Sequence, residues 1–208
     1  MADGGLLRVR PSTLLGVCAS LKPAPGGHRR SAVRSLLVYA LEMVERVYPD
    51  VGLLDLRDNR LPFFEGRMPG ELDDPAVAQA LSAVGAAGAL LLGIPGYWSG
   101  VSGVFKNFVD VLCGPAYDVV GEPATVFTGK DVGLLVVGAD ARSAEAALFQ
   151  AREIMSSTGA RLVEPAVSVS NPRSGEVDQA RLSQDLIVLG AELARRCHSP
   201  SPAPPVRG

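Results

Sequence analysis

The stretch 89–110 reads ALLLGIPGYWSGVSGVFKNFVD and decides the fold. Its first six residues are apolar and predict a buried strand, which the following Pro-Gly pair should end. Two large rings, Tyr97 and Trp98, come next, and a helix is expected to begin near Ser102. In a parallel sheet, ligands bind beyond the carboxyl ends of the strands. The stretch therefore predicts a strand, a ligand-binding loop and a helix in succession.

The same alternation of apolar strands and amphipathic helices extends along the chain in both directions. We expect strands over 13–18, 51–56, 88–94, 132–137 and 161–169, and helices over 31–47, 75–84, from about 102, 144–157 and 177–196. Near-continuous apolar strands separated by helices favour a parallel sheet that is covered on both faces. The pattern therefore predicts a doubly wound α/β fold, a three-layer sandwich.

Size and composition exclude several classes of protein. The 208 residues, of which 47% are hydrophobic, fit a single domain. A net charge of −2 and the lack of a dense basic cluster argue against nucleic acid as a partner. No apolar run has the length of a signal peptide or a membrane span, so we expect a cytoplasmic protein with no membrane partner. The three cysteines are widely spaced, and we expect no metal site.

The two ends differ from the rest in composition. We expect the domain to occupy residues 12–197, after a flexible N-terminal segment over 1–11. Residues 198–208 are rich in proline and cannot bury enough apolar surface to fold. They are expected to form a disordered tail.

The loop within 89–110 resembles the NADPH-dependent FMN reductase family, whose members carry Pro-Glu-Tyr-Asn, then Gly, Leu-Lys-Asn and Asp. The matching positions are Pro95, Tyr97, Gly103, Lys106, Asn107 and Asp110, and the departures are Gly96, Trp98 and Phe105. The resemblance implies a flavodoxin-like fold with a five-stranded parallel sheet of order 2-1-3-4-5. That order places the loops after the first and third strands across one crevice.

The loop after the first strand is a candidate phosphate site. It leads into a helix N-terminus, where unpaired N–H groups and the helix dipole favour anions. Ser20 and Ser31 supply hydroxyl groups, and Lys22 and Arg29 supply positive charge. The family's Gly-Ser-x-Arg-x-x-Ser is similar at Ser20, whereas Lys22 and Ser31 align only if extra residues are allowed. The alternative is an ordinary loop in which Ser31 merely caps the helix.

The resemblance assigns the flavin ring to two other loops. Its candidate contacts are Pro95, Gly96, Tyr97, Trp98 and Ser99 after the third strand, together with Gly138 after the fourth. The family carries a Gly-rich run at the second place, whereas here only Gly138 is present among residues 138–143. Two alternatives stay open, namely that the rings are core or interface residues and that Ser143 simply caps the fourth helix.

The function that the resemblance implies is an FMN-dependent NAD(P)H oxidoreductase. Its cofactors would be FMN and NADPH or NADH, and the flavin would perform the chemistry, so we assign no catalytic side chain. The acceptor could be free flavin supplied to a flavin-dependent monooxygenase, a quinone, an azo or nitro compound, or a biosynthetic intermediate. The alternative is a flavodoxin-like electron carrier or sensor that binds FMN without turning over NAD(P)H.

We also expect a homodimer or homotetramer, partly from the resemblance. The other ground is the helix near Ser102, whose apolar residues exceed what one sheet face requires: Val104, Phe108, Val109 and Leu112. The long connection 114–129 could be a lid over the flavin or merely a surface elaboration, and the resemblance favours a role at a subunit interface.

Overall fold

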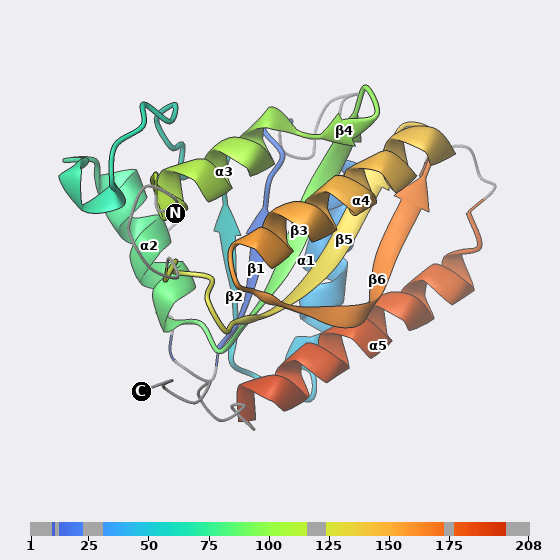
Figure 1. The fold of residues 1–208 in the computed structure, drawn as a ribbon. Coiled ribbons are helices and arrows are strands. Elements are labelled where there is room, and N and C mark those ends of the chain that lie inside the picture. Colours follow the sequence, from blue (N-terminus) through green and yellow to red (C-terminus); the bar gives the residue numbers. More distant parts are fainter. Residues whose placement is uncertain (1–9, 11–12, 23–30, 116–123, 173–176, 199–208) are drawn as a thin grey trace, which may run out of the picture.

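A parallel sheet forms the centre of the computed structural model, which describes residues 10, 13–22, 31–115, 124–172 and 177–198 (Figure 1). The strands are β1 (Leu14–Cys18), β2 (Val51–Asp55), β3 (Ala89–Tyr97), β4 (Gly100–Val101), β5 (Asp131–Gly138) and β6 (Arg161–Ser170). The helices are α1 (Ala32–Glu45), the short 3₁₀ helix η1 (Pro69–Glu71), α2 (Pro75–Ala86), α3 (Gly103–Cys113), α4 (Ala141–Ser157) and α5 (Gln179–His198). All elements that the sequence predicts are present.

The strand order is β2-β1-β3-β5-β6, and these neighbours are all parallel. Once the two-residue β4 is set apart, this is the expected flavodoxin-like order, which is confirmed. Helices α1 and α5 contribute to the apolar cluster on one face of the sheet, whereas α2, α3 and α4 contribute to the cluster on the other. The three-layer arrangement is visible in Figure 1.

The end of β3 differs from the prediction. Pro95 and Gly96 do not stop the strand, because they continue its pairing with β5, opposite Val137 and Gly138. The chain then turns back at Trp98 and forms β4, which pairs with β3 in the antiparallel sense. The expected ligand-binding loop is therefore a tight hairpin. The pairing with β5 is long-range, so no local signal reports it.

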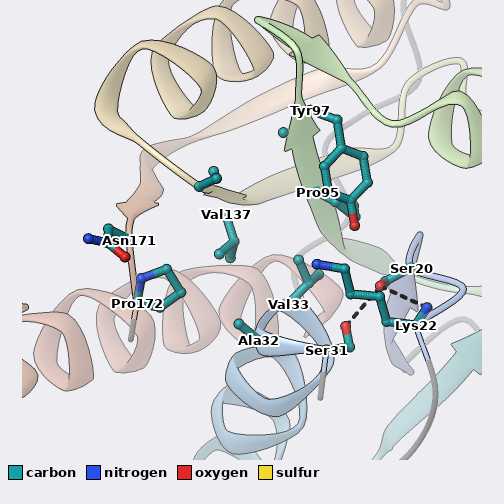
Figure 2. Close-up of a pocket in the computed structure, with 13 residues that line it drawn as sticks. Ser20, Lys22, Ser31, Ala32, Val33, Pro95, Tyr97, Val137, Asn171 and Pro172 are labelled. Carbon is teal, nitrogen blue, oxygen red and sulfur yellow. Dashed lines mark hydrogen bonds between the residues drawn. The ribbon is translucent and has the colours of Figure 1, made fainter. Parts of the chain in front are cut away.

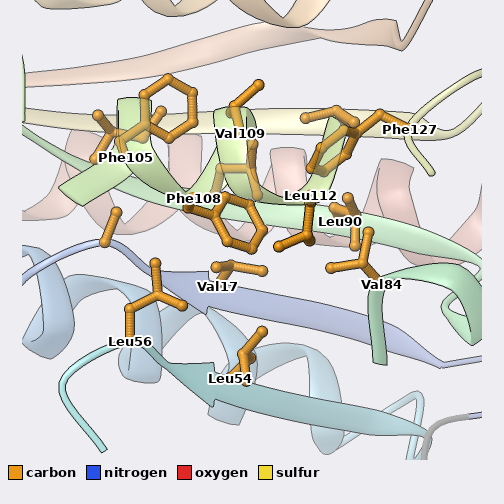
Figure 3. Packing of buried hydrophobic residues seen from close by; sticks show 14 of the residues in the cluster. Val17, Leu54, Leu56, Val84, Leu90, Phe105, Phe108, Val109, Leu112 and Phe127 are labelled. Carbon is orange, nitrogen blue, oxygen red and sulfur yellow. The ribbon is translucent and has the colours of Figure 1, made fainter. Parts of the chain in front are cut away.

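The core on the α3 face corrects the argument for oligomers. Phe108, Val109 and Leu112 are at most 4% exposed and pack over β1, β2 and β3 in the protomer (Figure 3). Phe127 is fully buried beside Phe108, with the rings 5.7 Å apart in an edge-to-face arrangement. The apolar face of α3 is thus used inside the protomer, and only Val104 of the four residues is half-buried. In the described part of the 114–129 connection, Phe127 is a core residue.

The chain ends lie largely outside the described residues. Helix α5 continues to His198, one residue beyond the expected end of the domain. The expected flexible segment 1–11, apart from Arg10, and the rest of the expected tail, 199–208, fall outside the described residues. None of the helices described is both long and apolar enough to cross a membrane.

The start of α4 lies directly against the ends of β3 and β5. A Cβ atom built on Gly138 would lie 2.5 Å from the backbone nitrogen of Ala144, and one built on Gly96 would lie 2.6 Å from the carbonyl oxygen of Ser143. Side chains cannot approach backbone atoms so closely, so both positions require glycine. This packing brings the N-terminal end of α4 to the carboxyl edge of the sheet.

We expect Gly138→Ala to lower the stability of the protein by about 1–3 kcal/mol, because α4 must move away from the sheet to admit the methyl group. Gly70→Ala is the matched control, since a Cβ atom at Gly70 would meet no atom within 4 Å. Thermal midpoints of the two variants check this. Equal midpoints would contradict the tight approach of α4.

Candidate functional site

A cavity of about 190 Å³ opens at the carboxyl ends of the strands, and we name it the strand-end cavity (Figure 2). The chain leaves β1 and β3 towards opposite faces of the sheet, and the cavity lies between these two connections, as expected for this topology. Its walls come from the loop after β1, the start of α1 and the ends of β3, β5 and β6. They consist of Ser20, Lys22, Ser31, Ala32, Val33, Pro95, Gly96, Tyr97, Val137, Gly138, Ala139, Asn171 and Pro172.

The polar end of this cavity is a pair of buried hydroxyl groups. Ser31 Oγ donates to Ser20 Oγ over 2.9 Å, and the two residues are only 4% and 3% exposed. Ser31 Oγ also accepts from Arg34 N over 3.2 Å, which makes Ser31 the N-cap of α1. Ser31 is therefore both the cap of the helix and a residue of the cavity wall. Hydroxyl groups and the first amides of α1 together form an environment suited to an anion.

Lys22 adds positive charge to this end. Its ammonium nitrogen lies 5.2 Å from the centre of the Tyr97 ring, within the range of a cation–π contact. This contact joins the loop after β1 to the β3–β4 hairpin across the cavity. Arg29, the other predicted cation, falls outside the described residues.

The hairpin brings only part of the predicted ring-contact set to the cavity. Pro95, Gly96 and Tyr97 line it, and Tyr97 is 39% exposed. Trp98 is 99% exposed and, like Ser99, does not line the cavity. Both residues have positive φ angles, 51° and 58°, because they form the tight turn between β3 and β4. The turn directs Trp98 into solvent.

The far wall contains residues that the sequence analysis missed. Asn171 and Pro172 follow β6, and the backbone N–H of Asn171 donates to the carbonyl of Gly138 over 3.1 Å. Asn171 has a φ of 43°, a conformation that asparagine adopts more readily than most residues. An Asn-Pro pair directly after a strand was the available signal. Gly138 also lines the cavity, although the packing of α4 already explains why it is glycine.

Helix α4, which follows Gly138, begins about one turn earlier than it would if Ser143 were its cap. Asp140, not Ser143, is the N-cap of α4, and its Oδ1 accepts from Ser143 N over 2.7 Å. The side chain of Asp140 is thus used to start the helix.

Ser102 is a positioning residue that the sequence analysis did not assign to the site. Its buried hydroxyl donates to the carbonyl of Ala19 over 3.1 Å and accepts from Phe105 N over 3.2 Å. The backbone N–H of Ser102 donates to the carbonyl of Pro95. One residue thus caps α3, closes the hairpin and holds the loop after β1 beside it.

Cys18, the last residue of β1, precedes the loop that forms the polar end of the cavity. Burial, and then the nearby carboxylate of Asp55, raise the pKa of the Cys18 thiol to about 11. Among the residues that the structure describes, no three His, Cys, Asp or Glu side chains come together as a metal site.

Comparisons with known proteins agree with this geometry. The family model described as NADPH-dependent FMN reductase matches residues 13–173. An oxidoreductase from Corynebacterium diphtheriae is 18% identical, with a TM-score of 0.70, over 93% of this chain and 99% of that chain. The apo form of the NADH:FMN oxidoreductase EMOB is 21% identical, with a TM-score of 0.64, over 94% and 93% of the two chains.

A third similar structure is FerB from Paracoccus denitrificans, a flavoenzyme NAD(P)H:(acceptor) oxidoreductase. It is 16% identical, with a TM-score of 0.63, over 90% of this chain and 98% of that chain. At these identities the three structures establish a common fold. A search of curated proteins found no match.

Proposed function

The chain belongs to the NADPH-dependent FMN reductase family, and we propose that it keeps FMN in the strand-end cavity while it reduces a small-molecule acceptor. It is an NAD(P)H-dependent flavin oxidoreductase, with FMN and NAD(P)H as cofactors. The observation that carries the placement of FMN is the buried Ser20–Ser31 hydroxyl pair at the N-terminus of α1. A phosphate group is the ligand that such a set of donors fits best.

The residues of the cavity fit FMN at both of its ends. The hydroxyls of Ser20 and Ser31, the first amides of α1 and the ammonium group of Lys22 would hold the phosphate. The ring would lie against Tyr97 and the backbone of Gly138, where flat apolar and amide surfaces are offered. When bound, FMN supplies the redox chemistry, accepting a hydride from NAD(P)H and passing electrons onward.

The protein's contribution is therefore orientation. Ser102 holds the loop after β1 against the hairpin, so the phosphate and ring contacts stay at a fixed separation. Cys18, at the end of β1, does not line the cavity, and burial raises the pKa of its thiol to about 11. No proton transfer from a side chain is needed to explain the reaction class.

Three uses of bound FMN are separated by one anaerobic experiment. The FMN-loaded protein is mixed with NADPH or NADH, one portion is passed through an ultrafilter, and a quinone is added to the remainder. We expect the flavin absorbance to bleach, to return with the quinone, and to stay with the protein. Flavin that bleaches with neither nucleotide would favour the electron-carrier alternative. Flavin that is recovered reduced in the filtrate would favour supply to a monooxygenase.

The two neighbouring rings of the hairpin should behave differently. We expect Tyr97→Ala to lower NADPH oxidation with saturating FMN by at least about tenfold, equal to about 1.4 kcal/mol in the barrier, because Tyr97 lines the cavity. Trp98→Ala, the matched control in the same turn, should leave this rate within about twofold because its ring is in solvent. Equal losses in both variants would contradict the assignment of Tyr97.

We also propose a cytoplasmic protein that forms a homodimer or homotetramer. Phe149 on α4, a large ring that is 66% exposed and does not line the strand-end cavity, supports association, since such surface is often covered by a partner. Light scattering at micromolar protein tests the assembly. A mass of 21.7 kDa, that of one chain, would refute it.

A further inference from the structure

A second cavity, of about 430 Å³, lies next to the strand-end cavity. Tyr97 lines both cavities, so the two are adjacent. We name it the side cavity. Its walls are largely apolar and include Leu56, Leu61, Phe63 and Val104. This size and composition are typical of a small-molecule site.

The wall of the side cavity is fixed by hydrogen bonds. Asn107 on α3 donates from Nδ2 to the carbonyl of Pro62 over 2.8 Å, and its Oδ1 accepts from Phe64 N over 2.9 Å. The segment that contributes Leu61 and Phe63 is thus attached to α3 by both halves of one amide. These hydrogen bonds hold the wall in place, so the side cavity is a defined part of the fold.

One of the described residues that line the side cavity carries a positive charge. Arg60 lines it and is exposed, and its Nε donates to the carbonyl of Arg57. Within the described ranges Arg60 makes no ion pair, whereas its neighbour Arg57 is paired with Asp55 and Asp58. A guanidinium group without a carboxylate partner, beside an apolar wall, is complementary to an anionic ligand with an apolar body.

We propose that the side cavity binds the electron acceptor, and that this acceptor is a planar, largely apolar quinone with one anionic substituent. The inference rests on the proposed function, because the acceptor must lie next to the flavin. The single cation among the described lining residues and the apolar wall suit such a molecule better than a dinucleotide, which carries several phosphate charges. In the overall reaction, NAD(P)H, a proton and the quinone give NAD(P)⁺ and the hydroquinone, with two electrons transferred.

The charge is tested by direct binding of probes that cannot be reduced. Naphthalene sulfonate and naphthol are titrated by calorimetry into the FMN-loaded protein and its Arg60→Gln variant. We expect the variant to bind the sulfonate about five- to tenfold more weakly and naphthol almost unchanged, since an exposed charge-assisted contact is lost. Arg46→Gln, the same change at an exposed residue at the far end of α1, is the control and should bind as the parent does.

The role of the side cavity as a binding space is tested by filling it with a larger side chain. Gly103 lines the side cavity at the first position of α3, and a Cβ atom there would meet nothing within 4 Å. Gly103→Leu should therefore fold, bind FMN and lose most of its affinity for both probes. Gly70→Leu, at an exposed glycine with equally open space, is the control for the larger side chain.

Steady-state kinetics then tests whether the side cavity is used in the reaction. With naphthoquinone sulfonate and the parent naphthoquinone as acceptors, Arg60→Gln should lower kcat/KM for the sulfonate by about the same five- to tenfold factor and leave the parent acceptor unchanged. Wild-type binding of both probes in Arg60→Gln and Gly103→Leu would overturn the proposal. That result would leave the proposed function intact if NAD(P)H still bleaches the flavin. An absence of bleaching, with probe binding as expected, would instead remove the proposed function and leave a site for anionic aromatic molecules.

Discussion

The double variant Ser20→Ala with Lys22→Gln should bind FMN about 30- to 150-fold more weakly than the wild type, a loss of about 2–3 kcal/mol. The reason is that one buried hydroxyl and one ammonium group leave the polar end of the strand-end cavity. Riboflavin has the same ring but no phosphate, so its affinity should change by less than about threefold. Fluorescence titrations of both ligands check this.

Two controls make the comparison selective. Lys106→Gln removes a lysine that pairs with Asp110 on the surface of α3, outside the strand-end cavity, and should bind both ligands normally. The thermal midpoint of the double variant without flavin reports any damage to the start of α1, where Ser20 contacts the N-cap Ser31. Equal losses of FMN and riboflavin would contradict a phosphate site at Ser20.

The largest expected effect on stability concerns Asp131, which begins β5 at the opposite edge of the sheet. Its carboxylate is almost fully buried and accepts from Arg161 over 2.8 Å and from Arg196 over 3.0 Å. These contacts join β5, β6 and α5. We expect Asp131→Asn to destabilise the protein by about 2–4 kcal/mol, since Arg161 then loses its carboxylate partner and Arg196 keeps only Glu192. The thermal midpoint should fall by about 5–15 °C, and FMN affinity should remain unchanged.

A surface pair provides the control for Asp131. Asp110→Asn removes an exposed i,i+4 contact with Lys106 and should cost less than about 0.5 kcal/mol. Similar midpoints for Asp131→Asn and Asp110→Asn would contradict a structural role for the Asp131 cluster.

The same cluster predicts how stability depends on pH. Although burial of Asp131 opposes ionisation, hydrogen bonds from Arg161 and Arg196 hold the pKa of its carboxyl group below the usual value. Hydrogen bonds from Arg195 and Arg196 lower the pKa of Glu192 to about 2. Such carboxylates stabilise the fold above their unfolded pKa of about 4, and this contribution is lost as the pH falls towards the folded pKa. The Asp131→Asn variant should lose less stability than the wild type between about pH 4 and pH 2.

The sequence predicted the order of elements well because the signals were local. Apolar runs identified the strands, and Ser31 and Ser102 were visible as helix starts. The hairpin was missed because Pro95 and Gly96 usually interrupt strands, and only pairing with β5 shows that they do not. The apolar face of α3 was misjudged for a related reason, because the sequence does not show that Phe127 returns to cover it.

The candidate site was predicted in part. Ser20, Ser31 and Tyr97 converge because the sheet order fixes which loops face each other, and that order follows from the fold class. Trp98 could not be separated from Tyr97 by sequence, because only the turn geometry sends one ring inward and the other outward. Asn171 was missed because it is distant in sequence and reaches the cavity through a backbone contact with Gly138.

A crystal structure of the protein grown with FMN tests the central claim most directly. We expect the phosphate within hydrogen-bond distance of Ser20 Oγ and Ser31 Oγ, at the N-terminus of α1, with the ring beside Tyr97 and Gly138. The side cavity should remain open beyond Tyr97. Density for the phosphate away from the two serines, or for the flavin ring in the side cavity, would contradict the account.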